Sequence, residues 1–217
     1  LAVFRELVKP RESVFRFGQV ATALADNPAV KLDQLFEHLV NRQFAQDFEP
    51  YWSFGARLRL EGRSSGRPRR SDLADMRGDA IVYLWDRTDA ADALGYHDRN
   101  FRGIPCGFVL TDLELDPSWT VTLSHEALEL VGDPQVNLLV KGPHPVDRRR
   151  RVFHWFEMCD AVQDESYEID SVLVSNFVLP LYFTPGEQPG GRNDFLGRSH
   201  EGHTLRSFGV NPGGYIG

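Results

Sequence analysis

The strongest constraint on the fold is the polarity pattern of one predicted helix, residues 119–131. Its apolar face consists of Leu123, Ala127, Leu130 and Val131. The opposite face carries His125 and Glu129, flanked by Val121 and Leu128. A helix at the surface of a globular protein presents polar residues on the face away from the core. The mixed face therefore predicts that His125 and Glu129 point into a cleft or a buried region, where ionisable groups need a partner.

The sequence of this helix also matches the spacing of a metal-binding helix. His125 and Glu129 are four residues apart and therefore project from one face. Glu126 is rotated from His125 by about 100°. In the H-E-x-x-H arrangement, the residues at i and i+4 bind zinc and the intervening glutamate is the general base. Here the second ligand is the carboxylate of Glu129, which zinc accepts, and Glu126 is the expected base.

The charge of the chain is unevenly distributed. The net charge is −7, which disfavours binding to nucleic acid or to an anionic membrane surface. Residues 86–133 and residues 152–187 each carry −7, whereas residues 55–77 and 134–151 each carry +4. The two acidic segments are expected to form a pocket that needs either a cation or the arginines at 148–151.

The remaining pattern predicts an α+β fold, because helices and strands are segregated along the chain. Strands are predicted at 14–17, 54–60, 79–85 and 107–112, and further helices at 32–47, closed by Pro50, and at 152–162. Residues 61–77 and 141–151 are predicted loops. We expect one domain over 1–217: an N-terminal extension (1–31), the sheet and metal helix (33–134) and a C-terminal subdomain (135–217).

Further candidate site residues lie outside the 119–131 helix. Glu157 and Asp160 belong to the second acidic segment, and Asp133 lies near the His125 face. Tyr96 and His97 lie in a predicted glycine-bounded loop, a usual place for substrate-binding or oxyanion-stabilising residues. His144 and His154 are weaker ligand candidates. Cys106 and Cys159 are too few for a four-cysteine zinc site.

Taken together, several short motifs resemble a set of uncharacterised bacterial and phage-associated proteins with a zincin-like pattern, over roughly residues 33–217. The matching segments are 95–98 (GYHD), 103–107 (GIPCG), 124–129 (SHEALE) with Asp133-Pro134, 157–160 (EMCD), 167–169 (YEI), 174–178 (VSNFV) with Pro180, and 213–215 (GGY). Glu129 replaces the second histidine of the usual protease signature.

The resemblance implies a zincin-like fold with a mixed sheet, a backing helix, an HExxE helix and an irregular C-terminal part. It also implies zinc and metalloprotease activity. In zincins whose third ligand is glutamate, that residue comes from a downstream helix. Glu157 is accordingly the expected third ligand, and Asp160 the residue that orients a ligand.

These observations predict a zinc metalloprotease-like hydrolase that acts on a peptide or protein lying along the strand at 107–112. The alternative is a non-catalytic zincin fold or a phage-type structural or interaction protein, in which hydrogen bonds or arginines satisfy the carboxylates. A sugar-cleaving carboxylate pair has no supporting motif. The sequence shows no apolar run of membrane-spanning length and no signal-peptide pattern. The expected location is the cytoplasm, or the virion if the protein is phage-derived.

Overall fold

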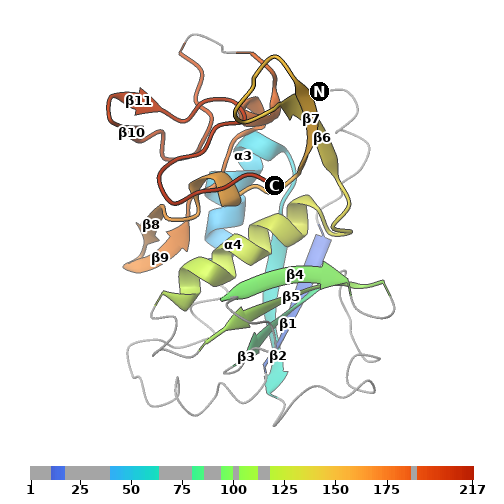
Figure 1. Ribbon diagram of the computed structural model, residues 1–217. Coiled ribbons are helices and arrows are strands. Elements are labelled where there is room, and N and C mark those ends of the chain that lie inside the picture. The colour runs from blue at the N-terminus through green and yellow to red at the C-terminus, as the bar shows by residue number, and fades with distance from the viewer. Residues whose placement is uncertain are drawn as a thin grey trace.

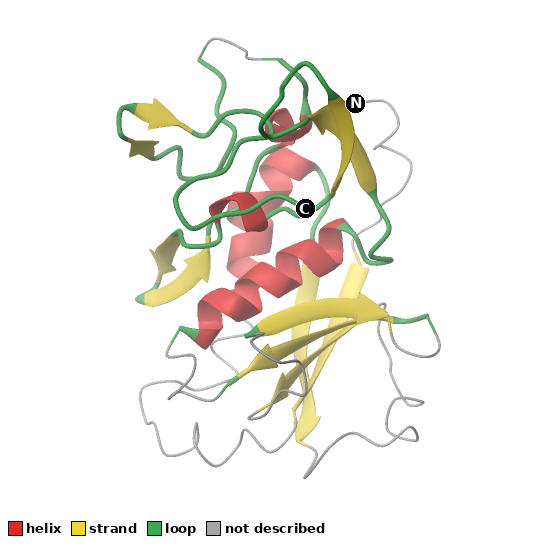
Figure 2. Cartoon of the chain, viewed as in Figure 1, coloured by secondary structure: helices red, strands yellow, loops and turns green. Residues whose placement is uncertain are grey.

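A computed structural model describes residues 11–17, 40–63, 80–85, 94–99, 103–111, 118–186 and 190–217. The predicted loop at 61–77 lies outside these residues except for its first three positions, which continue a strand. The predicted N-terminal extension lies outside them except for Arg11–Phe17. The fold of the described residues is a mixed α+β arrangement (Figures 1 and 2).

A five-stranded sheet forms one layer, in the order β2-β1-β3-β5-β4. Its strands are β1 (Arg11–Phe17), β2 (Ala56–Arg63), β3 (Ala80–Trp85), β4 (Gly95–Arg99) and β5 (Pro105–Leu110). The neighbours β2-β1, β1-β3 and β3-β5 are parallel, whereas the edge strand β4 is antiparallel to β5. The structure confirms the strands predicted from alternating or continuous apolar residues, and β1 is an inner strand of the sheet.

Two predictions about this sheet are wrong. The segment that contains Tyr96 and His97 is strand β4, not a loop, because its backbone pairs with β5 from Gly95↔Val109 to Arg99↔Pro105. Strand β5 is not at the edge, since it lies between β3 and β4. An extended peptide therefore cannot pair with the backbone of β5, and β4 is the outermost described strand at this side of the sheet.

Helix α4 (Trp119–Gly132) confirms the helix predicted at 119–131 and lies between the sheet and the C-terminal part of the molecule (Figure 1). Leu123, Ala127 and Leu130 pack into a cluster that also contains Val82 and Val109 of the sheet. Leu128 belongs to the same cluster and is fully buried. Both sides of the helix are therefore covered, which accounts for its apolar residues on two faces.

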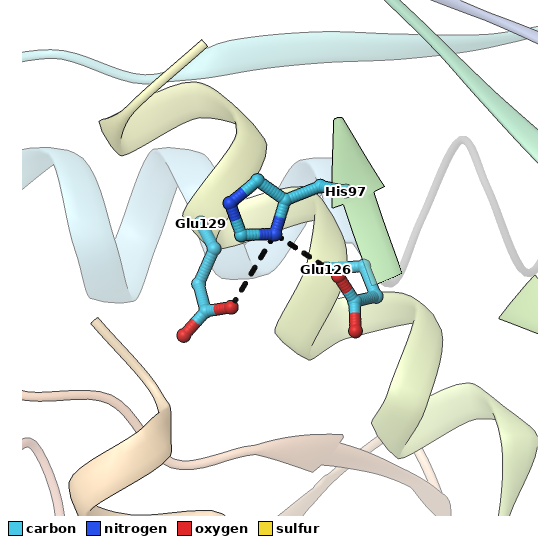
Figure 3. A group of neighbouring side chains, drawn as sticks. All are labelled: His97, Glu126 and Glu129. Carbon is cyan, nitrogen blue, oxygen red and sulfur yellow. Dashed lines mark hydrogen bonds and ion pairs between the residues drawn. The ribbon is translucent and has the colours of Figure 1, made fainter. Parts of the chain in front are cut away.

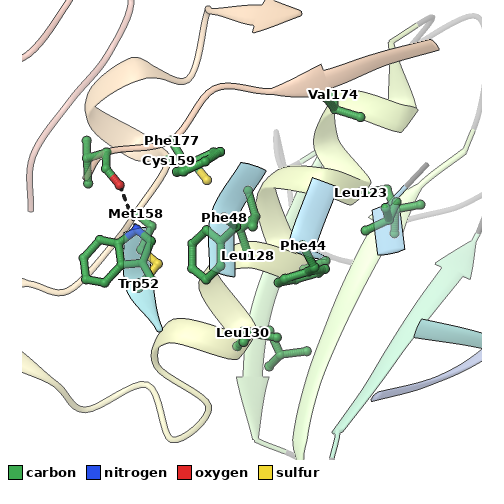
Figure 4. Packing of buried hydrophobic residues seen from close by; sticks show 14 of the residues in the cluster. Phe44, Phe48, Trp52, Leu123, Leu128, Leu130, Met158, Cys159, Val174 and Phe177 are labelled. Atoms are coloured by element: carbon green, nitrogen blue, oxygen red, sulfur yellow. Dashed lines mark hydrogen bonds between the residues drawn. The ribbon is translucent and has the colours of Figure 1, made fainter. Parts of the chain in front are cut away.

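The helix predicted at 32–47 is described only from Val40 onward, and it extends past its expected end. It contains a π-helical segment, Gln43–Phe48, and continues as α3 (Glu49–Trp52). Pro50 does not end this helix. It lies in the first turn of α3, where the missing backbone N–H of proline is tolerated. Phe44, Phe48 and Trp52 thereby reach the core beside α4 (Figure 4).

The C-terminal part consists of short two-stranded sheets and 3-10 turns. The strand pairs are β6 (Leu139–Pro143) with β7 (Arg151–Trp155), β8 (Ser166–Ile169) with β9 (Val172–Ser175), and β10 (Ser199–His200) with β11 (His203–Thr204). The 3-10 turns are Asp160–Val162 and Pro180–Phe183.

The predicted helix at 152–162 is therefore wrong. Residues 151–155 alternate in exposure, with Phe153 and Trp155 outward and His154 buried, and they pair with β6. A period of two fits a strand and not a helix. The predicted loop at 141–151 is shortened at both ends by the same pairing.

Candidate active site

Six ionisable side chains from three separate segments meet beside α4. We call His97, His125, Glu126, Glu129, Glu157 and Asp160 the site cluster. His97 comes from β4, the next three residues come from α4, and the last two come from the segment that follows β7. The two acidic segments of the sequence thus meet in the fold, as the charge distribution predicts.

Glu129 lies at the centre of the cluster. Its Oε2 atom is 3.1 Å from His125 Nε2, which is the one-turn neighbour expected from the i,i+4 spacing. Its Oε1 atom accepts a hydrogen bond of 3.0 Å from the backbone N–H of Cys159. The side chain of Glu129 is 3% exposed. This carboxylate therefore links α4 to the 156–160 segment and has a fixed orientation.

His97 reaches the cluster because β4 crosses α4 closely. Gly95, two residues earlier on the same face of β4, makes this approach possible: a Cβ atom there would lie 2.7 Å from Thr122 Cγ2 and 2.9 Å from Glu126 Cγ. Nδ1 of His97 is 3.2 Å from Glu126 Oε2 and 3.7 Å from Glu129 Oε2. Figure 3 shows the imidazole between these two carboxylates.

The 156–160 segment completes the cluster from the other side. Asp160 Oδ1 is 3.3 Å from His125 Nε2, and Glu157 Oε2 is 3.5 Å from His97 Nε2. Met158 and Cys159 between them are fully buried, so their packing fixes the segment against α4. Among the described residues, neither His97 Nε2 nor Glu157 Oε2 has a hydrogen-bond partner, although both atoms are buried.

Burial and the charges of neighbouring groups strongly shift the pKa values of the site cluster. Burial raises the pKa of Glu157, and the charge of Glu129 adds to this, so that the pKa is about 8. Burial lowers the pKa of His97, but the hydrogen bond to Glu126 and the charge of Glu129 outweigh it and raise the pKa to about 9. Perturbed groups that gather at one place are typical of functional sites.

The pKa values of Glu129 and His125, which are neighbours on α4, shift in opposite directions. Burial opposes ionisation of Glu129, but the charge of His125 more than offsets it and lowers the carboxyl pKa. Burial likewise opposes the imidazolium form of His125, yet the charge of Glu129 raises its pKa well above the usual value. In Glu126 burial dominates and raises the pKa.

Two sets of three residues could hold a metal ion. Within each set, every residue offers one potential ligand atom, and the three atoms lie within 4.8 Å of one another. The sets are His97 with Glu126 and Glu129, and His125 with Glu129 and Asp160. A tetrahedral zinc ion with ligands at about 2.0–2.2 Å separates its ligand atoms by about 3.3–3.6 Å. The contacts of His125, at 3.1 and 3.3 Å, are close to this spacing.

The structure also places the remaining predicted site residues. Glu157, expected as the third metal ligand, contacts His97, whereas Asp160, expected to orient a ligand, contacts the predicted ligand His125. Tyr96 points away from His97, because neighbouring strand residues face opposite sides of a sheet, and its ring stacks on Phe108 at 4.9 Å.

Asp133 and the two weaker histidine candidates have contacts outside the cluster. Asp133 Oδ2 accepts hydrogen bonds from the backbone N–H groups of Asn137 and Leu138, which shapes the turn after α4. His154 Nε2 is 3.0 Å from the carbonyl oxygen of Pro143. His144 Nδ1 accepts hydrogen bonds from the backbone N–H groups of Val146 and Asp147 in its own loop.

One residue next to the cluster was not predicted from the sequence. Tyr215 donates its backbone N–H to the carbonyl oxygen of Asp160 at 3.0 Å. The preceding Gly213-Gly214 pair is a signal that could have indicated it, since paired glycines often mark a close approach of two backbones.

Comparisons with known proteins add little to this geometry. A family model described as a protein of unknown function, DUF3037, matches residues 1–40, which is less than a fifth of the chain and includes no residue of the site cluster. No curated protein and no solved structure matches the chain. Among the described residues, no helix has the length and apolar character required to cross a membrane. A functional proposal must therefore be based on the cluster itself.

Proposed function

We propose that the protein is a zincin-like, metal-dependent hydrolase that binds Zn²⁺ through His125, Glu129 and Asp160. The observation that carries this proposal is the convergence of one imidazole nitrogen and two carboxylate oxygens, from α4 and the Asp160 turn, at a spacing suited to one ion. Nitrogen and carboxylate oxygen are both normal zinc ligands. In this proposal Asp160 is the third ligand in place of the expected Glu157, because Asp160 contacts His125 whereas Glu157 contacts His97.

The excess of carboxylates also supports a cation. In the described part of the chain, the four carboxylates of the cluster pair with histidines and not with the arginines at 148–151. Arg148 instead donates to the carbonyl oxygen of Ser207. In the described residues the non-catalytic alternative therefore depends on hydrogen bonds, such as that from Cys159 N–H to Glu129, and on protons rather than on these arginines.

Bound zinc would polarise a substrate carbonyl and make a bound water more acidic. Glu126 is the general base in this proposal: it takes the proton from the attacking water and later returns it to the leaving amine. His97 positions this base through the 3.2 Å contact between Nδ1 and Glu126 Oε2. The burial of Glu126, which raises its pKa, makes it a stronger base than a carboxylate in water.

A peptide is the substrate that best suits the surroundings of the cluster. Strand β4 is the outermost strand of the described sheet, and it runs directly past Glu126. An extended chain can add to such an edge through backbone hydrogen bonds. We therefore propose that the scissile peptide lies along β4, and not along the 107–112 strand.

Zinc analysis of the purified protein tests the metal site first. After incubation with zinc and buffer exchange, elemental analysis should find about one tightly held ion per chain, and His125→Ala and Glu129→Gln should lose it. His203→Ala is the matched control, because His203 is exposed on β11 and distant in sequence from the cluster. A wild-type protein that retains no zinc would refute the proposal.

Activity is tested separately with a peptide library read by mass spectrometry. Glu126→Gln should keep its zinc but lose hydrolysis, because the amide cannot accept the proton from water. Hydrolysis that survives in Glu126→Gln would contradict the assigned base. Zinc binding without any hydrolysis by the wild type would favour the non-catalytic alternative.

A further inference from the structure

Strand β4 brings a second set of possible metal ligands to α4, beside the set assigned to the zinc ion. Nδ1 of His97 lies 3.2 Å from Glu126 Oε2 and 3.7 Å from Glu129 Oε2. The ligand atoms of a tetrahedral zinc ion are about 3.3–3.6 Å apart, so these two distances lie on either side of the required spacing. One imidazole nitrogen and two carboxylate oxygens thus converge a second time within the site cluster.

The other ring nitrogen of His97 has the surroundings of a metal-bound histidine. Nε2 lies 3.5 Å from Glu157 Oε2, and the His97 side chain is only 8% exposed. Among the described residues, neither of these two buried atoms has a hydrogen-bond partner. A histidine that binds metal usually donates its other ring N–H to a carboxylate, which fixes the ring and its tautomer. With Nδ1 bound to a cation, the ring proton would lie on Nε2, facing Glu157.

The charge of the site cluster exceeds what one divalent cation can balance. Its four carboxylates carry four negative charges when ionised, and their ion pairs in the described residues are with the two histidines. Histidine binds metal in its neutral form. One Zn²⁺ ion would therefore leave two negative charges in a buried region, which is unfavourable. A second divalent cation would balance them.

We propose that the site cluster takes a second Zn²⁺ ion, bound by His97 Nδ1, Glu126 and Glu129, with Glu157 accepting a hydrogen bond from His97 Nε2. This inference rests on the proposed zinc site at His125, Glu129 and Asp160. Glu129 Oε2 belongs to both ligand sets, because it lies 3.1 Å from His125 Nε2 and 3.7 Å from His97 Nδ1. The two ions would share this oxygen, and their mutual repulsion makes the second ion the more weakly bound.

The second ion would inhibit the proposed hydrolysis. It occupies the space between His97 Nδ1 and Glu126 Oε2, whose 3.2 Å contact positions the general base. A carboxylate bound to a cation is a poor proton acceptor, so Glu126 could no longer take a proton from water. Hydrolysis should therefore increase with the first equivalent of zinc and decrease as the second ion binds.

Equilibrium dialysis against increasing free zinc, followed by elemental analysis, measures the number of bound ions. The wild type should hold one ion at low free zinc and two at high free zinc. His97→Gln should hold only the first ion. Glu157→Gln should weaken the second ion by about 10- to 100-fold, the usual effect of losing an outer partner of a metal ligand. The matched control is His203→Gln, on the exposed strand β11, which should behave like the wild type.

Cobalt distinguishes a shared site from an ion bound elsewhere on the protein. Two Co²⁺ ions that share Glu129 Oε2 should be magnetically coupled, so the electron paramagnetic resonance signal of the first ion should decrease as the second binds. His97→Gln should show the signal of a single, uncoupled ion. Far-UV circular dichroism checks that each variant is folded.

The outcomes separate this inference from the proposed function. A wild-type protein that holds one ion at every zinc concentration leaves the proposed hydrolase in place and overturns the second site. A second ion that persists in His97→Gln, or a cobalt signal that simply doubles, also overturns it. A wild type that binds no zinc refutes the metal site of the proposed function. Two coupled ions without hydrolysis of any peptide would support the second site and contradict the proposed hydrolase.

Discussion

Raising the pH should destabilise the metal-free protein, because folding keeps a proton on His97 that the unfolded chain releases. Burial lowers the pKa of this imidazole, but the hydrogen bond to Glu126 and the charge of Glu129 raise it to about 9 in the folded state. In the unfolded chain it is about 6.5. The stabilisation is therefore complete below pH 6.5 and is lost as the pH rises through 9.

The size of this effect follows from the shift. Each pKa unit corresponds to about 1.4 kcal/mol, so the interval from 6.5 to about 9 amounts to about 3 kcal/mol for His97. The side chain is only 8% exposed, so solvent screens little of this. Glu157 changes stability in the same direction, because burial and the charge of Glu129 raise its pKa to about 8. Its proton is also lost as the pH rises.

Urea unfolding in the presence of a chelator measures this stability directly. Trp52 and Trp119 are buried and should report unfolding by fluorescence. The free energy of unfolding should fall steadily between pH 6.5 and 9 in the wild type, and less steeply in His97→Gln, in which Glu157 still contributes. His203→Gln, on an exposed strand, should behave like the wild type. A wild-type stability that is constant or increases over this interval would refute the charge assignment of the cluster.

Two further predictions concern the approach of β4 to α4 and the protons on the ligands. Gly95→Ala should lower the free energy of unfolding by about 1–3 kcal/mol, because the new methyl group would lie 2.7 Å from Thr122 Cγ2. Gly55→Ala is the control, since its nearest neighbour would be 3.5 Å away; equal losses in both would contradict the close contact. Zinc affinity should increase with pH in competition titrations, because His125 must release a proton to bind metal, and a pH-independent affinity would exclude His125 as a ligand.

Local periodicity was sufficient to predict α4 and the inner strands of the sheet. The apolar residues Leu123, Ala127 and Leu130 of α4 recur with a helical period. The i,i+4 spacing of His125 and Glu129 correctly predicted that their side chains meet, at 3.1 Å. Strands β3 and β5 are continuous apolar runs buried within the sheet. Such features depend on the segment itself, so one sequence is enough to identify them.

The rest of the cluster depends on contacts between segments distant in sequence. His97 is 29 residues from Glu126, and it faces α4 only because β4 pairs antiparallel with β5 in one register. A shift by one residue would turn Tyr96 toward the helix instead. Residues 151–155 likewise became a strand through pairing with β6. Sequence periodicity contains no information about these partners, so it could not show that Glu157 contacts His97 while Asp160 contacts His125.

The charge balance of the cluster connects the zinc proposal with the pH prediction. Its four carboxylates exceed its two imidazoles, so full protonation of both histidines still leaves two negative charges in a buried region. Without metal, further protons reduce this excess, as the raised pKa of Glu157 indicates. Under the zinc proposal, a divalent cation would neutralise the same charge and displace protons from its ligands. Protons and metal would then compete for one site, so the stability of the metal-free protein and its affinity for zinc should change in opposite directions with pH.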